Sequence, residues 1–188
     1  LVVDDAHGFG VLGFNGRGTL SHFGIVSQRI VYMGTLGKSA GVAGAFVGGS
    51  TNLIEWLLQK GRTYIFTTAA PPPLAAALIK AVELIENGNP RRMHLQHIIE
   101  RFRTTLHTSR WQLLDSQTPI QPLVIGSNDE TLRVAETLMS EGLWVPAIRP
   151  PTVQAGTSRL RISFSAAHTE AHIDRLVDAL QRAETTAN

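Results

Sequence analysis

The amino-acid sequence predicts an α/β protein in two parts, a larger α/β part over residues 1–115 and a small α+β domain over residues 116–188. The first observation is that short apolar runs ending in polar residues alternate with helical patterns along the first part, as in sheets covered by helices. The second is that the pattern from Ser116 onward changes to strand, helix, strand, strand, helix, which is enough for a lobe of its own. We therefore expect the boundary within residues 109–118.

The composition excludes several classes of protein. The chain has 188 residues, of which 43% are hydrophobic and 17% charged, so it can build a packed core and is not a disordered chain. It has no cysteine, which excludes disulfides, thiolate metal sites and cysteine nucleophiles and fits a cytoplasmic protein. A net charge of +2 gives no reason to expect nucleic acid, and no apolar run reaches the ~18–20 residues that span a bilayer.

The first part is predicted to hold three strands and the first two long helices: strands over 1–4, 29–33 and 45–47, helices over 52–60 and 71–87. Asn52 with Glu55 three residues on is a pattern that begins helices, and three consecutive prolines form a rigid entry to the second one. The first strand is apolar and ends in the carboxylate of Asp4. Because domains seldom begin inside a buried strand, we expect a further N-terminal part before Leu1.

Pro90 opens a further helix, on one face of which we expect Met93, Ile98, Phe102 and Leu106. The small domain follows, with strands predicted over 120–125, 143–148 and 159–165 and helices over 128–142 and 169–183. Ser127 and Glu130 have the spacing of a capping box, which predicts the start of the first of these two helices.

Asp4 and His7 form the first candidate site, at the carboxyl end of the first strand. Open α/β sheets bind ligands in the crevice beyond the carboxyl ends of their strands. An aspartate there can hold a cationic nitrogen, and the histidine three residues on can contact the same ligand. The alternative is a solvated turn in which Asp4 or Asp5 caps the local backbone.

Lys38 is the second candidate, because Gly34, Gly37 and Gly41 surround it with backbone that can approach a ligand closely. A lysine amine becomes a nucleophile toward carbonyls when its surroundings lower its pKa, and the hydroxyl of Thr35 suits a phosphate oxygen. A nucleotide-binding P-loop is disfavoured, since its first glycine would have to stand where the chain has Tyr32. A lysine in an ordinary turn remains the alternative.

The third candidate lies in the stiff Pro/Gly loop over residues 149–158 and the strand after it. Arg159 and Arg161 are two residues apart and therefore share one face of that strand, where a guanidinium can hold a carboxylate through two hydrogen bonds. The alternative is an exposed strand face. His168 and His172 have a spacing that can bind zinc, but without a third ligand nearby we expect no metal site.

Four ordered motifs together resemble the α-oxoamine synthase family: Asp4-Asp5-Ala6-His7-Gly8, Gly34-Thr35-Leu36-Gly37-Lys38, Thr67-Thr68-Ala69-Ala70-Pro71-Pro72, and Pro151-Thr152 followed by Arg159-Leu160-Arg161. The resemblance runs from residue 1 to about residue 180 and corresponds to the C-terminal half of the family's chain. It implies a dimeric enzyme dependent on pyridoxal 5'-phosphate (PLP), with the aspartate-aminotransferase-like fold type I. The expected fold is then the C-terminal part of the PLP-binding large domain, residues 1–115, plus a small C-terminal domain, residues 116–188.

The resemblance also implies roles for residues near the cofactor. Lys38 would form the internal aldimine with PLP and would move protons at the substrate α-carbon. Asp4 would pair with the pyridine nitrogen, and His7 would donate a hydrogen bond to the ring oxygen. Thr35 would bind the phosphate.

The resemblance implies a homodimer whose two subunits share the active site, with Thr67 or Thr68 reaching the phosphate of the partner subunit. Arg161 would hold the amino-acid carboxylate, and Thr152 would lie near the substrate, with Arg149 as a further substrate-binding residue. Residues 148–153 and 165–169 most resemble the member of biotin biosynthesis that condenses L-alanine with a pimeloyl thioester on acyl carrier protein or CoA.

Three functional readings stay open. The first is that acyltransferase, present here as a fragment that we expect to be inactive alone. The second is another α-oxoamine synthase, for example one that joins glycine to acetyl-CoA. The third is a non-catalytic remnant that keeps the motifs but does not bind the cofactor. None of the three involves nucleic acid or a membrane.

Overall fold

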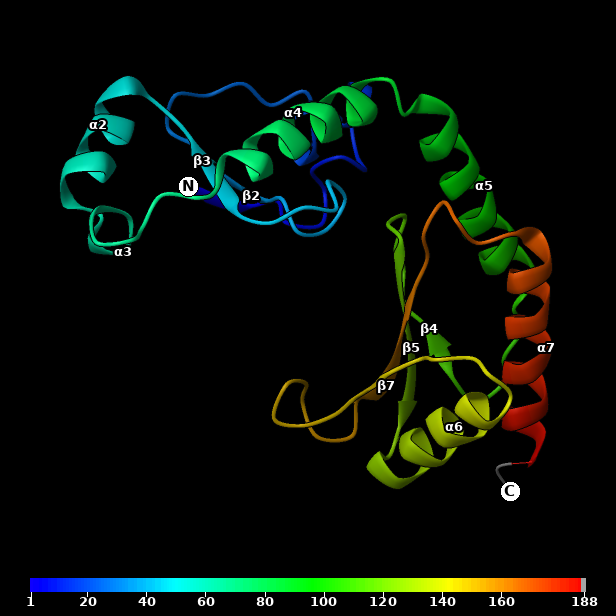
Figure 1. Ribbon diagram of the computed structural model, residues 1–188. Helices are drawn as coiled ribbons and strands as arrows, with labels where there is room; N and C mark the ends of the chain where they lie inside the picture. Colours follow the sequence, from blue (N-terminus) through cyan, green and yellow to red (C-terminus); the bar gives the residue numbers. More distant parts are fainter. Residues whose placement is uncertain (187–188) are drawn as a thin grey trace. The chain divides into compact units, whose positions relative to one another are not determined.

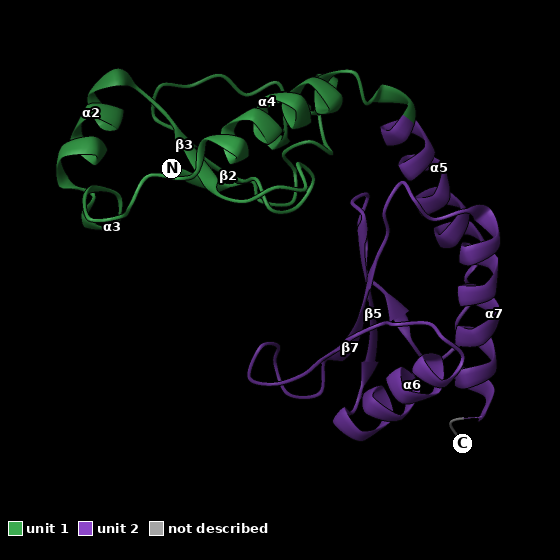
Figure 2. Ribbon diagram, in the orientation of Figure 1, with its two compact units in different colours: residues 1–90 green, residues 91–188 purple. Residues whose placement is uncertain are grey.

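The computed structural model describes residues 1–186, which form two compact units, one from Leu1 to Pro90 and one from Arg91 onward (Figure 2). The predicted mixture of helices and strands is present in both units (Figure 1). The expected domains, 1–115 and 116–188, divide the chain at a different residue and stay a prediction; residues 187 and 188 lie outside the described part. No helix within residues 1–186 is long and apolar enough to cross a membrane.

The first unit is built on a three-stranded sheet in the order β1-β2-β3. These strands, β1 (Val2–Asp4), β2 (Val31–Thr35) and β3 (Ala45–Gly48), confirm the three predicted ones with shifts of one or two residues. Strands β1 and β2 are parallel, with Asp4 opposite Met33, whereas β3 runs antiparallel to β2 and pairs Ala45 with Thr35. The carboxyl ends of β1 and β2 therefore meet at one edge of this sheet.

Five helical segments complete the first unit: η1 (Phe14–Gly16), α1 (Thr19–His22), α2 (Thr51–Lys60), α3 (Arg62–Ile65) and α4 (Pro72–Glu86). The two long helices, α2 and α4, confirm the predicted ones. The predicted start at Asn52 was wrong, because the N-cap of α2 is Ser50 and its side chain makes no capping hydrogen bond. The short elements η1, α1 and α3 carry no hydrophobic period long enough to predict.

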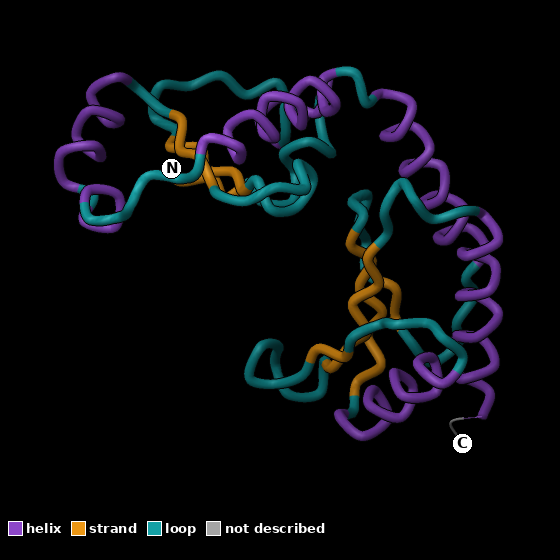
Figure 3. The backbone as a smooth tube through the Cα atoms, in the orientation of Figure 1, coloured by secondary structure: helices purple, strands orange, loops and turns teal. Residues whose placement is uncertain are grey.

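The strands of the second unit form a four-stranded antiparallel sheet in the order β4-β5-β7-β6. Figure 3 colours strands orange and helices purple. Its strands are β4 (Gln112–Leu113), β5 (Ile120–Gly126), β6 (Ala147–Ile148) and β7 (Ser158–Ser163). The strand predicted over 143–148 is thus shortened to its last two residues. Pro146 explains this, because proline has no N–H to donate to a neighbouring strand; its carbonyl still accepts a hydrogen bond from the Arg161 N–H, at 2.9 Å.

Three long helices accompany this sheet: α5 (Asn89–Thr105), which begins in the first unit, α6 (Asn128–Ser140) and α7 (Glu170–Thr186). The capping box that begins α6 is confirmed on one side, since Ser127 Oγ accepts the Glu130 N–H at 3.1 Å. Leu123 and Leu160 are opposite each other in β5 and β7, and both are fully buried. Neighbouring apolar side chains from the helices complete this core.

Met93 does not belong to that core, contrary to the prediction. Its side chain is 73% exposed, and Leu95, Ile98 and Phe102 form the buried face of α5 instead. These three residues follow the helical spacing of three and four, whereas Met93 lies two positions before Leu95 and therefore on the opposite side. Phe102 packs edge-on against Phe164, with ring centroids 5.1 Å apart.

Candidate active site

Four of the predicted site residues meet at one edge of the first unit's sheet. Asp4 ends β1 and Thr35 ends β2, and the two strands are parallel neighbours. The turn that carries His7 and the loop that carries Lys38 leave from this same edge. Because ligands of open α/β sheets bind beyond the carboxyl ends of the strands, this edge is the candidate site.

Asp4 uses one carboxylate oxygen locally, since its Oδ1 accepts the Ala6 N–H at 3.0 Å. The capping alternative is therefore correct for this oxygen. The other oxygen, Oδ2, makes no hydrogen bond or ion pair with any residue between 1 and 186, and the residue is exposed. Asp4 thus keeps a negatively charged oxygen available for a cationic group.

Asp5, next to it, is the buried carboxylate of the turn, with only 3% of its surface exposed. It accepts the Thr19 N–H at 2.8 Å, the Thr19 hydroxyl, and the Tyr32 hydroxyl of β2. Burial raises the pKa of Tyr32, and the hydrogen bond to Asp5 and its negative charge raise it further, so the phenol stays protonated as the donor. A side chain on Gly18, whose φ is +88°, would overlap the Asp5 carboxylate.

Asp5 was missed as a functional support by sequence reasoning, which treated it only as a local cap. The available signal was indirect: an aspartate doublet followed, within fifteen residues, by a run of glycines that leaves room for a buried carboxylate. The carboxylate holds the turn between Asp4 and His7 against β2, the strand that leads to Thr35. Asp5 therefore holds in place the turn between Asp4 and His7, without itself being one of the candidate site residues.

Thr35 carries a buried hydroxyl that is unsatisfied. Its Oγ1 has no hydrogen-bond partner among residues 1–186. A buried hydroxyl without a partner costs roughly 1–3 kcal/mol, so such an atom normally marks a place where another group completes the hydrogen bond. A phosphate oxygen at the edge of the sheet would do so, in agreement with the predicted role of Thr35.

Lys38 lies in the loop between β2 and β3, exposed and with no ion pair or hydrogen bond from its amine to any residue of the described part. The loop is closed by its own backbone, since Leu36 N–H donates to Gly44 O and Val42 N–H donates to Leu36 O, both at 2.9 Å. The other two lysines lie in helices, Lys60 at the end of α2 and Lys80 in α4, where Lys80 pairs with Glu83 at 2.8 Å. Lys38 is thus the lysine placed at the candidate site.

Thr67 and Thr68 lie in the exposed segment between α3 and α4. The Thr67 hydroxyl donates to the carbonyl of Thr63, one turn earlier. No hydrogen bond within residues 1–186 joins either threonine to the other four residues of the candidate site.

The remaining predicted residues belong to the second unit. Arg149 and Thr152 lie exposed in the loop after β6, where Thr152 N–H donates to Arg149 O at 3.0 Å. Arg161 lies half-buried in β7, and its guanidinium makes no hydrogen bond or ion pair within the described residues. Arg159, on the same face, is folded back on its own loop, where Nε donates to Thr157 O at 3.0 Å. Of the two arginines, Arg161 has the free guanidinium.

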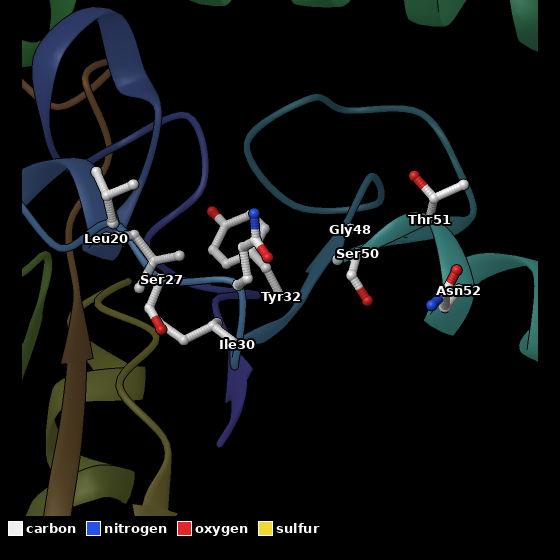
Figure 4. Close-up of a pocket in the computed structure, with 11 residues that line it drawn as sticks. Leu20, Ser27, Ile30, Tyr32, Gly48, Ser50, Thr51 and Asn52 are labelled. Atoms are coloured by element: carbon white, nitrogen blue, oxygen red, sulfur yellow. The ribbon is translucent and has the colours of Figure 1, made fainter.

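A pocket of about 590 Å³ lies at the opposite end of β2, lined by Leu20, Ile30, Tyr32, Gly48 and Ser50 among others (Figure 4). None of the predicted site residues lines it. Its polar groups are hydroxyls and amides without a charged side chain, so it offers no reactive group. The candidate site of this unit lies at the other edge of the sheet.

The sequence profile of the aminotransferase class I and II family matches residues 1–180. The chain belongs to this family. Membership in the aminotransferase class I and II family confirms the expected resemblance and agrees with the candidate site at the carboxyl edge of a partly parallel sheet.

Within the aminotransferase class I and II family, individual relatives show which members the chain is similar to. The chain is 61% identical, over all of its 188 residues and 48% of the relative, to 8-amino-7-oxononanoate synthase of Azoarcus sp. (strain BH72). The crystal structure of 8-amino-7-oxononanoate synthase from Francisella tularensis is 31% identical with a TM-score of 0.85, over 98% of this chain and 54% of that one. The chain spans about half the length of the curated relatives it matches.

A third similar structure is the serine palmitoyltransferase of S. paucimobilis with a bound PLP–myriocin aldimine. It is 28% identical with a TM-score of 0.90, over 99% of this chain and 47% of that one. The three likenesses confirm the predicted fold, the C-terminal part of a fold type I large domain followed by a small α+β domain.

Proposed function

We propose that the full-length product of the gene encoding this chain is a PLP-dependent 8-amino-7-oxononanoate synthase of biotin biosynthesis. It would condense L-alanine with a pimeloyl thioester, releasing carbon dioxide and the thiol of acyl carrier protein or CoA. The observation that carries the proposal is the 61% identity, along the whole chain, to a relative of that name. The motifs around Asp4 and Lys38 lie within the matched residues.

The residues at the edge of the sheet fit PLP. The unsatisfied hydroxyl of Thr35 suits its phosphate, the free oxygen of Asp4 suits its protonated pyridine nitrogen, and the unpaired amine of Lys38 suits its aldehyde. When bound, this cofactor supplies an aldehyde for amines and a ring that accepts the electron pair released at the substrate α-carbon.

Each residue then has one task. Asp4 holds the proton on the pyridine nitrogen through its negative charge, while Thr35 donates its hydroxyl hydrogen to a phosphate oxygen. His7 donates a hydrogen bond to the oxygen on the cofactor ring. Lys38 removes the α-proton of the amino acid and returns a proton to the α-carbon of the product, because its amine is both within the glycine-rich loop and unpaired.

The second unit supplies the substrate-binding groups of the proposal. Arg161 binds the carboxylate of L-alanine through its free guanidinium, and Arg149 and Thr152 contribute from the loop after β6. Thr67 and Thr68 serve the phosphate of the partner subunit in a cytoplasmic homodimer. Their exposure, and the lack of a link to the site of their own chain, support that assignment.

The test adds PLP to the full-length gene product and records the visible absorbance band, which borohydride then converts into a stable mass increase on the Lys38 peptide. We expect the band and the label in the wild type and neither in Lys38→Ala. Lys80→Ala is the matched control, because Lys80 is an exposed lysine already paired on α4. A normal band in Lys38→Ala would overturn the proposal, and no band in the wild type would favour the non-catalytic remnant.

The substrate is tested separately. We expect turnover of L-alanine with a pimeloyl thioester to exceed turnover of glycine with acetyl-CoA or succinyl-CoA. The likeness to serine palmitoyltransferases, at 28% identity, keeps other α-oxoamine synthases as the second candidate. Preference for glycine, or for a different acyl-CoA, would assign the chain to one of those relatives.

A further inference from the structure

Ser39, the residue after Lys38, makes a contact that ties the lysine loop to the turn carrying His7. Its hydroxyl donates a hydrogen bond to the carbonyl oxygen of Phe9, at 2.5 Å, across 30 residues of sequence. Phe9 follows His7 by two residues. This bond therefore links the two segments from which the proposed catalytic groups project.

The acceptor of this bond is itself held firmly. The peptide that carries the Phe9 carbonyl donates its N–H, that of Gly10, to the carbonyl of Gly16 at 2.8 Å, and the Phe9 N–H donates to the carbonyl of Asp5 at 2.9 Å. The Phe9 ring packs edge-on against Phe46 of β3, with centroids 5.1 Å apart. Ser39 thus reaches a carbonyl whose position is fixed on both sides.

The next residue, Gly10, leaves the space in which the Ser39 side chain lies. Its φ is +81°, and a Cβ at this position would overlap both the Oγ and the Cβ of Ser39. A positive φ and a close neighbour each favour glycine on their own. The fit of Ser39 against Gly10 shows that the two segments are packed together at this point.

The other hydrogen bonds of the lysine loop are internal to the loop. They run from Leu36 N–H to Gly44 O, from Val42 N–H to Leu36 O, and from Gly41 N–H to Lys38 O. These bonds shape the loop itself. The Ser39 hydroxyl, in contrast, joins the loop to the turn that carries His7 by a hydrogen bond.

We propose that Ser39 is a positioning residue, which sets where the Lys38 amine lies relative to His7 and the cofactor through its hydrogen bond to the Phe9 carbonyl. This inference rests on the proposed function, because it concerns the reach of Lys38 toward PLP. Reactive groups must be held within a fraction of an ångström of their working positions, and a hydrogen bond one residue away from the amine's own backbone contributes directly to that.

The experiment compares Ser39→Ala, which removes the hydroxyl, with Ser39→Thr, which keeps it. The first measurement is the rate at which the visible band forms after PLP is added to the full-length apoprotein. The second is the exchange of the L-alanine α-proton with deuterium when no thioester is present. Ser140→Ala is the matched control, since it removes an exposed hydroxyl-to-carbonyl hydrogen bond in α6 of the other unit.

We expect Ser39→Ala to slow both processes by roughly tenfold, with the same final band and the same borohydride label on Lys38, because a displaced amine reacts more slowly but remains accessible. For Ser39→Thr and Ser140→Ala, both rates should stay within about twofold of the wild-type rates. Wild-type rates in Ser39→Ala, or a lower melting temperature as its single effect, would overturn the proposal. A wild type in which Lys38 is not labelled would instead overturn the proposed function, so the two failures are distinguishable.

Discussion

The Tyr32 hydroxyl donates a hydrogen bond to the carboxylate of Asp5, across 27 residues of sequence. The bond joins β2 to the turn after β1, and the carboxylate also holds the backbone and hydroxyl of Thr19. Three segments of the first unit therefore converge on one buried carboxylate. The edge of the sheet that carries Asp4 and Thr35 is therefore supported by a buried carboxylate.

Removing the Tyr32 hydroxyl tests this brace. We expect Tyr32→Phe to lower the free energy of unfolding by about 1–3 kcal/mol, because the Asp5 carboxylate loses a donor in a buried place. Urea unfolding of the full-length product measures the change. Tyr64→Phe is the matched control, since Tyr64 is exposed and its hydroxyl makes no hydrogen bond within residues 1–186. Equal stability of the two variants would contradict the bracing role.

In the second unit, Glu184 of α7 is another buried carboxylate whose removal we expect to lower stability. Glu184 is 8% exposed and accepts backbone N–H groups from Ser109, Arg110 and Trp111, the shortest at 2.7 Å. Glu184→Gln replaces an acceptor oxygen by a donor that faces those donors. We expect a loss of about 1–3 kcal/mol in the free energy of unfolding, measured by urea denaturation.

Glu136→Gln serves as the control for Glu184, because Glu136 is an exposed residue of α6. We expect its free energy of unfolding to stay within about 0.5 kcal/mol of the wild type, as for most surface substitutions. If Glu184→Gln is as stable as this control, the carboxylate does not hold the 109–111 turn.

His168 predicts how stability depends on pH. Its Nδ1 accepts the Ser165 N–H at 3.1 Å, and its own carbonyl receives a hydrogen bond from His94 Nε2 at 2.8 Å. Burial lowers the pKa of His168, and the nearby charge of His172 lowers it further. The folded state therefore favours neutral His168. Its contribution to stability is fully present above the unfolded pKa, about 6.5, and is lost as the pH falls through the lower folded pKa.

The free energy of unfolding, measured between about pH 7.5 and 5, tests whether stability falls on acidification, because this range lies on either side of the ordinary histidine pKa. We expect the wild type to lose stability on acidification more steeply than His168→Asn, which removes the titrating group. His107→Asn is the control, because it replaces an exposed histidine by the same residue. A wild-type slope in His168→Asn would show that His168 does not titrate in the folded state as inferred.

The sequence predicted those features that depend on neighbouring residues. Apolar runs located β1, β2 and β3 to within two residues, and Ser127 three residues before Glu130 located the start of α6. Glycine spacing and the aspartate at a strand end pointed to Lys38 and Asp4, which the structure places after two parallel neighbouring strands whose carboxyl ends meet; their roles stay a prediction.

The parts that sequence reasoning missed depend on partners far along the chain. Asp5 is a buried anchor because Thr19 and Tyr32 surround it, and Ser39 is tied down because Phe9 presents a carbonyl; no local pattern encodes either distance. Met93 illustrates a different limit, since a hydrophobic residue near a predicted face can still lie two positions out of phase with it.

Arg161 and Arg159 share a face of β7 but differ in the hydrogen bonds of their guanidinium groups. This difference allows a test of the proposed carboxylate-binding role of Arg161. Arg159 donates through Nε to Thr157 O and through Nη2 to Thr157 Oγ1, at 3.0 and 3.1 Å. Arg161 has no such partner within the described residues. Its guanidinium is the one free to bind a carboxylate with two hydrogen bonds.

We expect Arg161→Ala to raise the KM for L-alanine by roughly 10- to 100-fold, since a hydrogen bond to a charged group contributes about 1.5–3 kcal/mol. Arg159→Ala should change it by less than about threefold, because that arginine is engaged by its own loop. Steady-state kinetics of the full-length product with a saturating pimeloyl thioester measure both values. A larger increase of KM in Arg159→Ala would assign the carboxylate-binding role to Arg159. An equal increase in both variants would indicate that the substitutions disturb β7 in general rather than remove a specific contact.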